Sequence, residues 1–194
     1  MGQIRIIGGR WRGRKIQVPA LPDLRPTPDR VRETLFNWLA PMIHGATCLD
    51  LFAGSGILGL EALSRGAEKV VFVEKTEAAF KALRLHLDAL GSTHAQIHQG
   101  DALALLPQFH EQFDLIFLDP PYQSNLLSES LNALGRLNLL KPSSYVYLES
   151  NEQTEISNLE HWNIIRQKRA GQVNYQLMQL NRSDLDRGKQ HEWG

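Results

Sequence analysis

The pattern of apolar positions changes along the chain. Residues 3–18 alternate apolar and basic side chains around a Gly-Gly pair, which is typical of a hairpin or of two short strands. Three prolines then interrupt the periodicity in residues 19–26, so a linker is expected there. A helical period runs from Thr27 to about Leu39, with Thr27 in the N-cap position and Pro28 as the first helical residue.

From residue 47 onward, short apolar runs alternate with longer segments of helical period. The expected strands are 47–52, 69–74, 95–98, 113–118 and 145–149, and the expected helices are 57–65, 76–90, 102–110 and 126–137. Strands that alternate with helices predict an α/β fold with a mostly parallel sheet, helices on both faces and right-handed crossovers. Residues 162–168 and 173–180 depart from this alternation and predict a closing antiparallel hairpin.

These patterns predict three units. Residues 1–40 are expected to form an N-terminal hairpin and helix, and residues 41–181 an α/β domain. Residues 182–194 are polar and are expected to be a mobile tail. A chain of 194 residues is long enough for one ordinary domain with a small extension.

Composition indicates the cellular compartment and the kinds of site to be expected. The sequence has no run of about 18 apolar residues, and no apolar signal-peptide core follows the basic N-terminus. We therefore expect a cytoplasmic protein without membrane contact. The single cysteine, Cys48, lies in an apolar run, and no Cys/His pattern has the spacing of metal ligands, so no metal site is expected.

The formal net charge is zero, but the charge is distributed unevenly. Residues 1–32 carry eight basic and two acidic side chains, a balance of +6, so the rest of the chain is at −6. A basic end on a neutral protein is typical of contact with a polyanion, and an indole among arginines suits RNA. A solvated charged surface is the alternative. The side chains expected to bind RNA are Arg5, Arg10, Trp11, Arg12, Arg14, Lys15 and Arg30.

The strongest chemical signal is Asp119-Pro120-Pro121-Tyr122, which directly follows an apolar run. Each proline fixes φ and lacks an N–H, so the chain stays extended and its carbonyls point into the expected cleft. A carboxylate beside a backbone carbonyl provides two acceptors, which suit the two N–H groups of an exocyclic amine on a base. Tyr122 is then expected to stack on that base. The alternative is a Pro-Pro turn with Asp119 as a capping acid.

Acidic residues recur where the expected strands end. The carboxyl ends of parallel strands lie at one edge of a sheet, which is where ligands of such folds bind. We therefore expect four carboxylates to line one site, although each alone is also a possible helix cap. They are Asp50, Glu74, Asp101 and Asp119.

A glycine-rich loop follows the first of these strands. Gly54, Gly56 and Gly59 have the spacing of a dinucleotide-binding loop, and Glu74 lies at the distance expected for an acid that binds ribose hydroxyls. A nicotinamide-dependent oxidoreductase is therefore one alternative. Asp50 favours a different ligand, because its carboxylate would repel a pyrophosphate but attract the ammonium group of S-adenosylmethionine, which carries no phosphate.

Several of these motifs together resemble a known family. Asp50-Leu-Phe-Ala-Gly-Ser-Gly resembles motif I of the class I S-adenosylmethionine-dependent methyltransferases, and Asp119-Pro-Pro-Tyr resembles their amino-methylating motif IV. With Arg5-Ile-Ile-Gly-Gly-Arg-Trp-Arg-Gly-Arg and the segment from Arg25 to Leu39, the resemblance is to the RsmD family, the small-subunit rRNA guanine-N2 methyltransferases. It covers about residues 3–180.

The resemblance implies a fold and a reaction. The fold is a Rossmann-like class I methyltransferase fold, with a mostly parallel seven-stranded sheet, an antiparallel C-terminal hairpin and a small N-terminal hairpin and helix. The reaction is methyl transfer from S-adenosylmethionine to the exocyclic N2 of a guanine in 16S rRNA. This reaction needs no metal, and a monomer is expected, because a small enzyme that acts on a large RNA has no need of a second subunit. Its partner is 16S rRNA or an assembling small ribosomal subunit. An adenine-N6 methyltransferase acting on DNA or RNA and a non-catalytic RNA-binding module are the remaining alternatives.

The resemblance also assigns roles to individual residues. Catalysis is assigned to Asp119, Pro120, Pro121 and Tyr122. Within the cofactor site, the motif I loop would hold the methionine part, Glu74 the ribose, and Asp101 with Ala102 the adenine edge. The full set assigned to the cofactor is Arg25, Thr27, Asp50, Phe52, Ala53, Gly54, Gly56, Glu74, Asp101 and Ala102.

Overall fold

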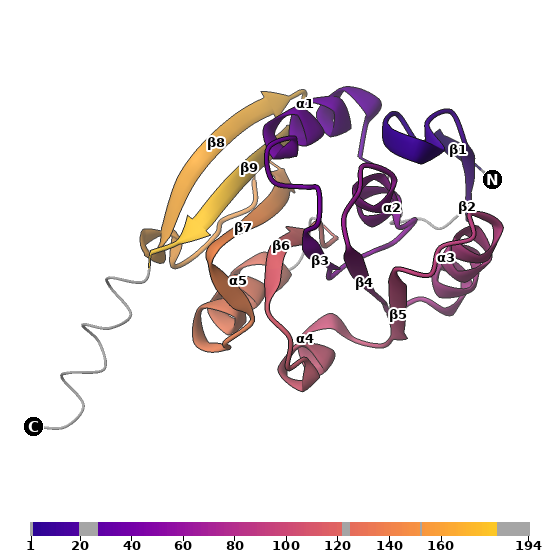
Figure 1. The fold of residues 1–194 in the computed structure, drawn as a ribbon. Coiled ribbons are helices and arrows are strands. Elements are labelled where there is room, and N and C mark those ends of the chain that lie inside the picture. Colours follow the sequence, from indigo (N-terminus) through magenta and orange to yellow (C-terminus); the bar gives the residue numbers. More distant parts are fainter. Residues whose placement is uncertain (1, 20–26, 122–124, 152, 182–194) are drawn as a thin grey trace, which may run out of the picture.

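A seven-stranded sheet forms the centre of the protein (Figure 1). The computed structural model describes residues 2–19, 27–121, 125–151 and 153–181. The strand order is β5-β4-β3-β6-β7-β9-β8. The strands are β3 (Thr47–Asp50), β4 (Lys69–Glu74), β5 (Ala95–Gln99), β6 (Phe113–Leu118), β7 (Leu140–Asn151), β8 (Trp162–Ala170) and β9 (Val173–Leu180).

The pairing directions define where the strand order reverses. Strands β3 to β7 pair in parallel, whereas β9 is antiparallel to β7 and β8 is antiparallel to β9. From β3 the chain adds β4 and β5 on one side and later β6 and β7 on the other. The predicted mostly parallel sheet with a closing antiparallel hairpin is confirmed. Ligands of such sheets bind where the order reverses, which here is the carboxyl edge beside β3 and β6.

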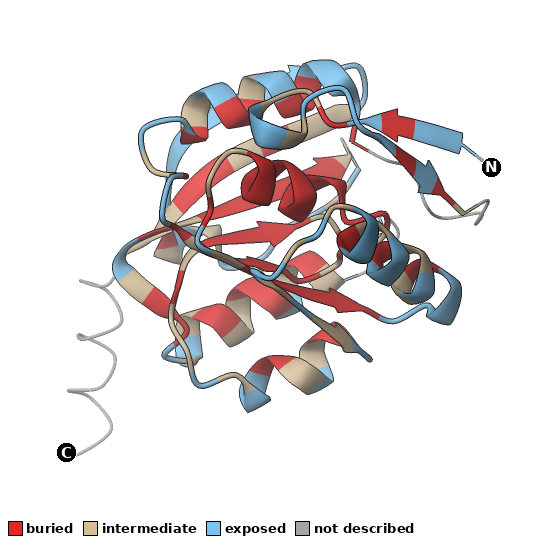
Figure 2. Ribbon diagram, turned by 45° about the vertical axis from the view of Figure 1, so that its right-hand side comes forward, coloured by how far each residue is buried: buried red, intermediate tan, exposed pale blue. Residues whose placement is uncertain are grey.

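Helices cover both faces of the sheet, and most central strand residues are buried (Figure 2). Successive side chains of a strand point to opposite faces, so Cys48 joins one apolar core and Leu49 the other. Strands buried on both faces read as continuous apolar runs, which is why they were recognisable in the sequence. The first core is covered by the N-terminal hairpin, α1 (Asp29–Leu39), α2 (Ile57–Ser64) and α3 (Glu77–Ala89), and the second by α4 (Ala102–Leu105) and α5 (Leu126–Arg136).

The N-terminal segment forms the predicted hairpin. Strands β1 (Gly2–Arg5) and β2 (Lys15–Val18) pair antiparallel, with a short 3₁₀ turn between them. Its apolar side chains belong to the first core of the sheet. The backbone N–H of Trp11 donates to Ser64 Oγ at 2.9 Å, and this hydroxyl donates to the Gly8 carbonyl at 2.6 Å. The hairpin is therefore attached to α2, the helix that follows the glycine loop.

A buried ionic network connects the hairpin to two helices. The guanidinium of Arg32 on α1 contacts Glu61 Oε2 on α2 at 3.4 Å and donates to the Arg5 carbonyl at 2.9 Å. Arg65 contacts the other oxygen of Glu61 at 2.9 Å, and the Ile7 N–H donates to Glu61 at 3.0 Å. Arg32 and Glu61 are both fully buried. Although Arg32 is one of the basic residues of the N-terminal segment, its charge is used inside the fold.

The strand expected over 47–52 ends at Asp50, because the glycine loop turns away from the sheet there. Two further local expectations differ from the structure. Helix α1 begins at Asp29, with Pro28 in the N-cap position, so the expectation that Thr27 caps this helix is wrong. The Thr27 hydroxyl instead contacts Glu149, which is far away in the sequence. The expected helix over 102–110 is divided into α4 and a 3₁₀ turn, because Pro107 lacks an N–H and its ring disfavours a continuing α-helix. Within the described ranges, no helix is long and apolar enough to cross a membrane.

Candidate active site

Acidic side chains follow one another along the carboxyl edge of the sheet. Asp50 and Glu74 are the last residues of β3 and β4, and Asp119 directly follows β6. Leu118 pairs with Leu148, so Asp119 and Glu149 are neighbours on adjacent strands. Glu149 was not among the residues selected from the sequence. It could have been found by the same signal, because it is the acid at the end of the next apolar run.

The glycine loop is held in place by acids from two strands. The Gly54 N–H donates to Glu74 Oε2 at 2.7 Å, and the Gly59 N–H donates to Asp50 Oδ2 at 3.1 Å. Gly54 and Gly56 have φ angles of 54° and 76°, a region that favours glycine. These contacts shape the loop at the start of α2 and bring its backbone to the edge of the sheet.

Glu74 is fixed between the loop and the next helix. Besides its contact with Gly54, its Oε1 accepts the Thr76 N–H at 2.6 Å. A carboxylate has about four acceptor positions, so these two bonds leave capacity for a ligand. The role of Glu74 in binding ribose hydroxyls remains a prediction.

Asp101 is the N-cap of α4. Its Oδ1 accepts the N–H groups of Leu103 and Ala104 at 3.1 and 3.3 Å, and its Oδ2 forms an ion pair with Lys75 at 3.1 Å. The Lys75 hydrogen bond and the backbone N–H groups hold the pKa of Asp101 below its usual value. Asp101 therefore has the role of a helix cap, which was the alternative expected from the sequence. Its contact with the adenine edge of the cofactor remains a prediction.

Asp119 lies beside a buried hydrogen-bonded cluster. The Thr27 hydroxyl is 2.7 Å from Glu149 Oε1 and 3.5 Å from Asp119 Oδ2. The Tyr147 hydroxyl donates to the same Glu149 oxygen at 2.8 Å. Thr27, Tyr147 and Glu149 are buried, whereas Asp119 is partly exposed. Of the predicted catalytic motif, Asp119, Pro120 and Pro121 are described.

Both neighbouring carboxyl groups have a raised affinity for protons. Burial raises the pKa of Asp119 well above its usual value, and the charges of Glu149 and then Asp50 raise it further. Burial also raises the pKa of Glu149, while the hydrogen bonds from Thr27 and Tyr147 act in the opposite direction. Ionising both of two adjacent carboxyl groups, one buried and one partly exposed, is costly, so the pair favours a state that retains a proton.

The charges at this edge fit one class of cofactor better than another. Asp50, Glu74, Asp119 and Glu149 lie at the carboxyl ends of four neighbouring strands, at the edge of the sheet where the glycine loop begins. Such a set disfavours a pyrophosphate and suits a ligand that carries positive charge and no phosphate. Phe52 and Ala53, which were predicted to bind the cofactor, lie in the glycine loop. Ala102, from the same predicted set, is buried at the start of α4. No group of three or more His, Cys, Asp or Glu side chains in the described part of the chain is arranged to hold a metal ion.

Asp50 predicts a pH-dependent stability of the ligand-free protein. Burial and the charge of Glu74 raise its pKa to about 7, although the Gly59 N–H acts in the opposite direction. The folded state therefore binds more protons than the unfolded state. This contribution is fully present below about pH 4 and is lost as the pH rises through about 7, with a slope of at most about 1.4 kcal/mol per pH unit. Urea unfolding between pH 5 and 8 should show this fall in the free energy of unfolding.

Asp50→Asn should reduce that slope, because asparagine does not ionise and can still accept the Gly59 N–H. Asp88→Asn is a matched control, since Asp88 is exposed on α3. If Asp50→Asn had the same slope of unfolding free energy against pH as the wild type, the pH dependence would not come from Asp50.

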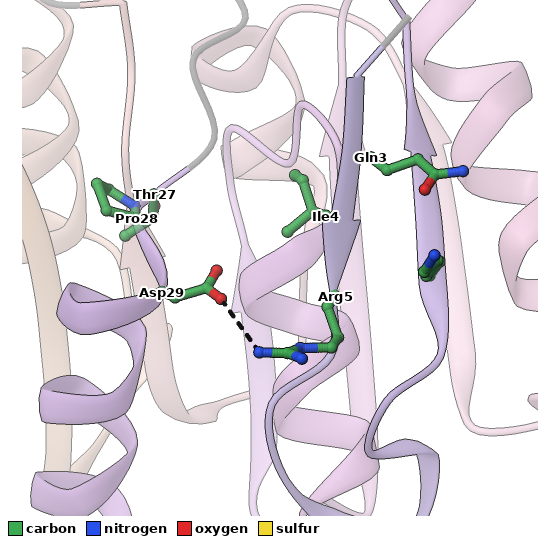
Figure 3. A pocket seen from close by; sticks show the side chains of 7 residues that line it. Gln3, Ile4, Arg5, Thr27, Pro28 and Asp29 are labelled. Atoms are coloured by element: carbon green, nitrogen blue, oxygen red, sulfur yellow. Dashed lines mark ion pairs between the residues drawn. The ribbon is translucent and has the colours of Figure 1, made fainter.

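A groove connects the basic hairpin to Thr27. It has a volume of about 440 Å³ and lies between the hairpin and the beginning of α1 (Figure 3). Arg5 on the hairpin and Asp29 on α1 face each other across it, with 3.9 Å between Arg5 Nη2 and Asp29 Oδ2. The lining residues are Gln3, Ile4, Arg5, Lys15, Thr27, Pro28 and Asp29.

The basic residues predicted to bind RNA are largely exposed. The Arg10 guanidinium lies 4.3 Å from the centre of the Trp11 ring, and Trp11 itself is half-buried against the core. Arg14 donates to the Ala89 carbonyl at 3.3 Å. Three further members of the set, Arg12, Lys15 and Arg30, are exposed. Two predicted site residues, Arg25 and Tyr122, lie outside the described residues, as does the tail 182–194.

The chain is similar to known proteins over nearly its whole length. The family described as conserved hypothetical protein 95 matches residues 4–179. The chain is 47% identical over 179 residues to the ribosomal RNA small subunit methyltransferase D of Escherichia coli strain K12, covering 92% of the chain and 90% of that protein. It is 44% identical over 182 residues to the protein of the same name from Haemophilus influenzae, covering 92% and 94%. A solved structure described as putative methyltransferase YhhF from E. coli superposes with a TM-score of 0.83 at 46% identity, covering 92% of this chain and 98% of that one.

Proposed function

Because the chain belongs to the RsmD family, we propose that it transfers a methyl group from S-adenosylmethionine to the exocyclic N2 of a guanine in 16S rRNA. The methyltransferase names of its relatives support the reaction class and the ribosomal RNA substrate. The observation that carries the proposal is the position of Asp119 and Pro120, at the carboxyl edge of β6 and next to the strand that leads into the glycine loop. The choice of guanine N2 rests on the family resemblance.

The residues at this edge have distinct tasks in the proposed reaction. The loop from Asp50 to Gly59 and the carboxylate of Glu74 would hold the cofactor. When bound, S-adenosylmethionine supplies a methyl group activated by a positively charged sulfur, which takes back the electron pair of the broken bond. Asp119 and the Pro120 carbonyl accept the two N–H groups of the amine, so its lone pair is free to attack. The new bond to carbon requires the amine to lose one proton.

The substrate base must leave its stack to reach Asp119, as in other enzymes that modify bases. The basic hairpin supplies positive charge on the same side of the molecule as Thr27, and the groove between them offers a path for an RNA strand. These features support RNA as the substrate. The acidic edge argues against the nicotinamide alternative, because a dinucleotide would place its pyrophosphate near Asp50 and Glu74.

The proposal is tested by incubating the purified protein with isotopically labelled S-adenosylmethionine and either unmodified small subunits or naked 16S rRNA. Nucleoside mass spectrometry then identifies the labelled base. Label in N2-methylguanosine is the expected result. Label in N6-methyladenosine would retain the chemistry and overturn the substrate, since an adenine amine presents the same two N–H groups to Asp119. Comparing the two RNA samples shows whether the substrate is free RNA or an assembled subunit.

Replacing Arg10, Arg12 and Arg14 with glutamine is expected to weaken RNA binding. The affinity of the variant should also depend less on the salt concentration. Each lost phosphate contact should reduce the slope of log K against log salt by about 0.7–0.9, so the combined change is about 2–3 if all three contact phosphates. Filter binding at several salt concentrations measures this slope. Arg136→Gln serves as a control, because Arg136 is exposed on α5, over the opposite face of the sheet. An unchanged slope in the triple variant would show that the three arginines are ordinary surface residues.

A further inference from the structure

The buried cluster behind Asp119 has a chemical arrangement that amine binding alone does not require. Thr27 comes from the N-terminal extension, Tyr147 and Glu149 come from β7, and all three side chains are buried. Thr27 is 122 residues away from Glu149 in the sequence, yet their oxygens are 2.7 Å apart. Thr27 Oγ1 is also the atom that contacts Asp119, at 3.5 Å.

The number of hydroxyl hydrogens in this cluster determines which group donates in each hydrogen bond. A threonine hydroxyl has one hydrogen to donate and can also accept. The short contact with Glu149 takes that hydrogen, and the only hydrogen of the Tyr147 hydroxyl goes to the same oxygen. The longer contact between Thr27 and Asp119 is then completed by a proton on Asp119. The hydrogens therefore run from Asp119 to Thr27 and from Thr27 to Glu149.

The surrounding charges place the negative charge on Glu149. Burial raises the pKa of both carboxyl groups. Glu149 receives two short hydrogen bonds from buried hydroxyls, which favour its charged form, whereas Asp119 faces the charges of Glu149 and Asp50 and has only the longer contact with Thr27 in favour of its charged form. Among the described residues, two more polar groups lie next to the cluster: Tyr175 of β9, which pairs with Glu149, and the Arg32 guanidinium, which donates to the Thr27 carbonyl at 3.2 Å. Before the reaction, the favoured state is a neutral Asp119 and an ionised Glu149.

We propose that Glu149 is the final proton acceptor of the methyl transfer, and that the Thr27 hydroxyl carries the proton to it from Asp119. As the amine nitrogen forms its bond to carbon, its N–H proton passes to the free oxygen of Asp119. The O–H proton of Asp119 moves to Thr27, and the Thr27 proton moves to Glu149. Asp119 is neutral before and after the step. The positive charge of the methyl donor and the negative charge of Glu149 are both neutralised, so atoms and charges balance.

This inference rests on the proposed methyl transfer to an amine, and it gives Thr27 a role different from cofactor binding. Asp119 touches the amine, while Thr27 and Glu149 act through it as positioning and proton-accepting residues. The N-terminal extension then has a second task besides RNA contact, because it contributes the hydroxyl that connects the two carboxyl groups.

Kinetics of three variants test the relay. Thr27→Val removes the hydroxyl but keeps the shape, Glu149→Gln removes the charge, and Thr27→Ser restores a hydroxyl. We expect the first two to lower kcat by about 10²-fold, with unchanged KM for RNA and unchanged affinity for S-adenosylmethionine. Thr27→Ser should stay near wild type, and the double variant should be no slower than the slower single variant, because the two residues act as one unit.

Thr34→Val is the matched control for Thr27→Val, because Thr34 lies on α1, the helix that begins two residues after Thr27, and the described contact of its hydroxyl is with the Arg30 carbonyl of that helix. Thr27→Val with wild-type kcat would overturn the relay. Thr27→Ser as slow as Thr27→Val would also overturn it, because the loss would then not come from the missing hydroxyl.

A second measurement needs neither RNA nor methyl transfer. In ligand-free protein labelled with ¹³C at the aspartate carboxyl, NMR follows the titration of Asp119. Glu149→Gln should lower the pKa of Asp119 by at least about one unit, since it removes the adjacent charge. The exposed Glu129 on α5 provides the control Glu129→Gln. An unchanged titration would overturn the relay, even if guanine methylation is confirmed. If another base is methylated, the proposed substrate fails, while the titration and the order of the kcat values still decide the relay.

Discussion

Replacing Asp119 with alanine is expected to lower the rate of methyl transfer by about 10²–10⁴-fold while the affinity for S-adenosylmethionine stays nearly unchanged. Asp119 directly follows β6, and its carboxyl group contacts Thr27 rather than the glycine loop. Its removal therefore takes away an acceptor for the amine and the first member of the proton path, but leaves the loop contacts of Asp50 and Glu74 in place. Single-turnover kinetics and calorimetric titration with the cofactor measure the two quantities separately.

Asp114→Asn is a suitable control for Asp119→Ala. Asp114 lies on β6, near the end of the strand opposite to Asp119, where its carboxylate accepts hydrogen bonds from the Thr47 N–H and the Lys141 ammonium at 2.9 and 2.7 Å. This variant is expected to affect stability and leave the chemistry intact. A loss of cofactor affinity in Asp119→Ala as large as its loss of rate would remove Asp119 from catalysis and make it a cofactor ligand.

The second large effect is expected for Gly56→Ala. Gly56 has a φ of 76° at the start of α2, and a Cβ atom there would lie 2.3 Å from Leu83 Cδ1. Leu83 is a fully buried residue of α3, so it has little room to move. Backbone strain and overpacking together should lower the free energy of unfolding by about 2–4 kcal/mol. Because the loop must shift, affinity for S-adenosylmethionine should also fall, by about tenfold or more.

Gly45→Ala separates these two causes. Gly45 has a similar φ of 74°, but a Cβ atom there has nothing within 4 Å. The control variant should lose only about 1–2 kcal/mol, from backbone strain alone, and should bind the cofactor like wild type. Urea unfolding and calorimetry compare the two proteins. Equal losses of stability would mean that the contact with Leu83 contributes nothing.

Local sequence patterns were sufficient to predict most helices and strands and the edge of the sheet at which the site lies. Strands such as β4 and β6 are buried on both faces, so their residues form apolar runs that are visible without knowing their neighbours. Alternation with helices then predicts a parallel sheet, and in a parallel sheet all carboxyl ends point the same way. This is why Asp50, Glu74 and Asp119 could be assigned to one edge from the sequence, and why the glycine spacing could be assigned to a loop.

Three features depended on which segments the tertiary structure brings together. Arg32 belongs to a basic segment in the sequence, but packing of α1 on α2 buries it against Glu61. Thr27 has the sequence context of a helix cap, yet its hydroxyl is used by Glu149. Glu149 itself became part of the site only through its position next to Asp119 on the adjacent strand.

The physical reason is the difference between periodicity and register. Periodicity is a property of neighbouring residues along the chain, so the sequence by itself determined the strands, the helices, the acidic edge and the glycine loop. Which oxygen lies 2.7 Å from Thr27 depends on strand order, on the pairing of β6 with β7 and on the path of the N-terminal extension. These are set by the packing of the two cores on either side of the sheet, and only the tertiary structure decided them.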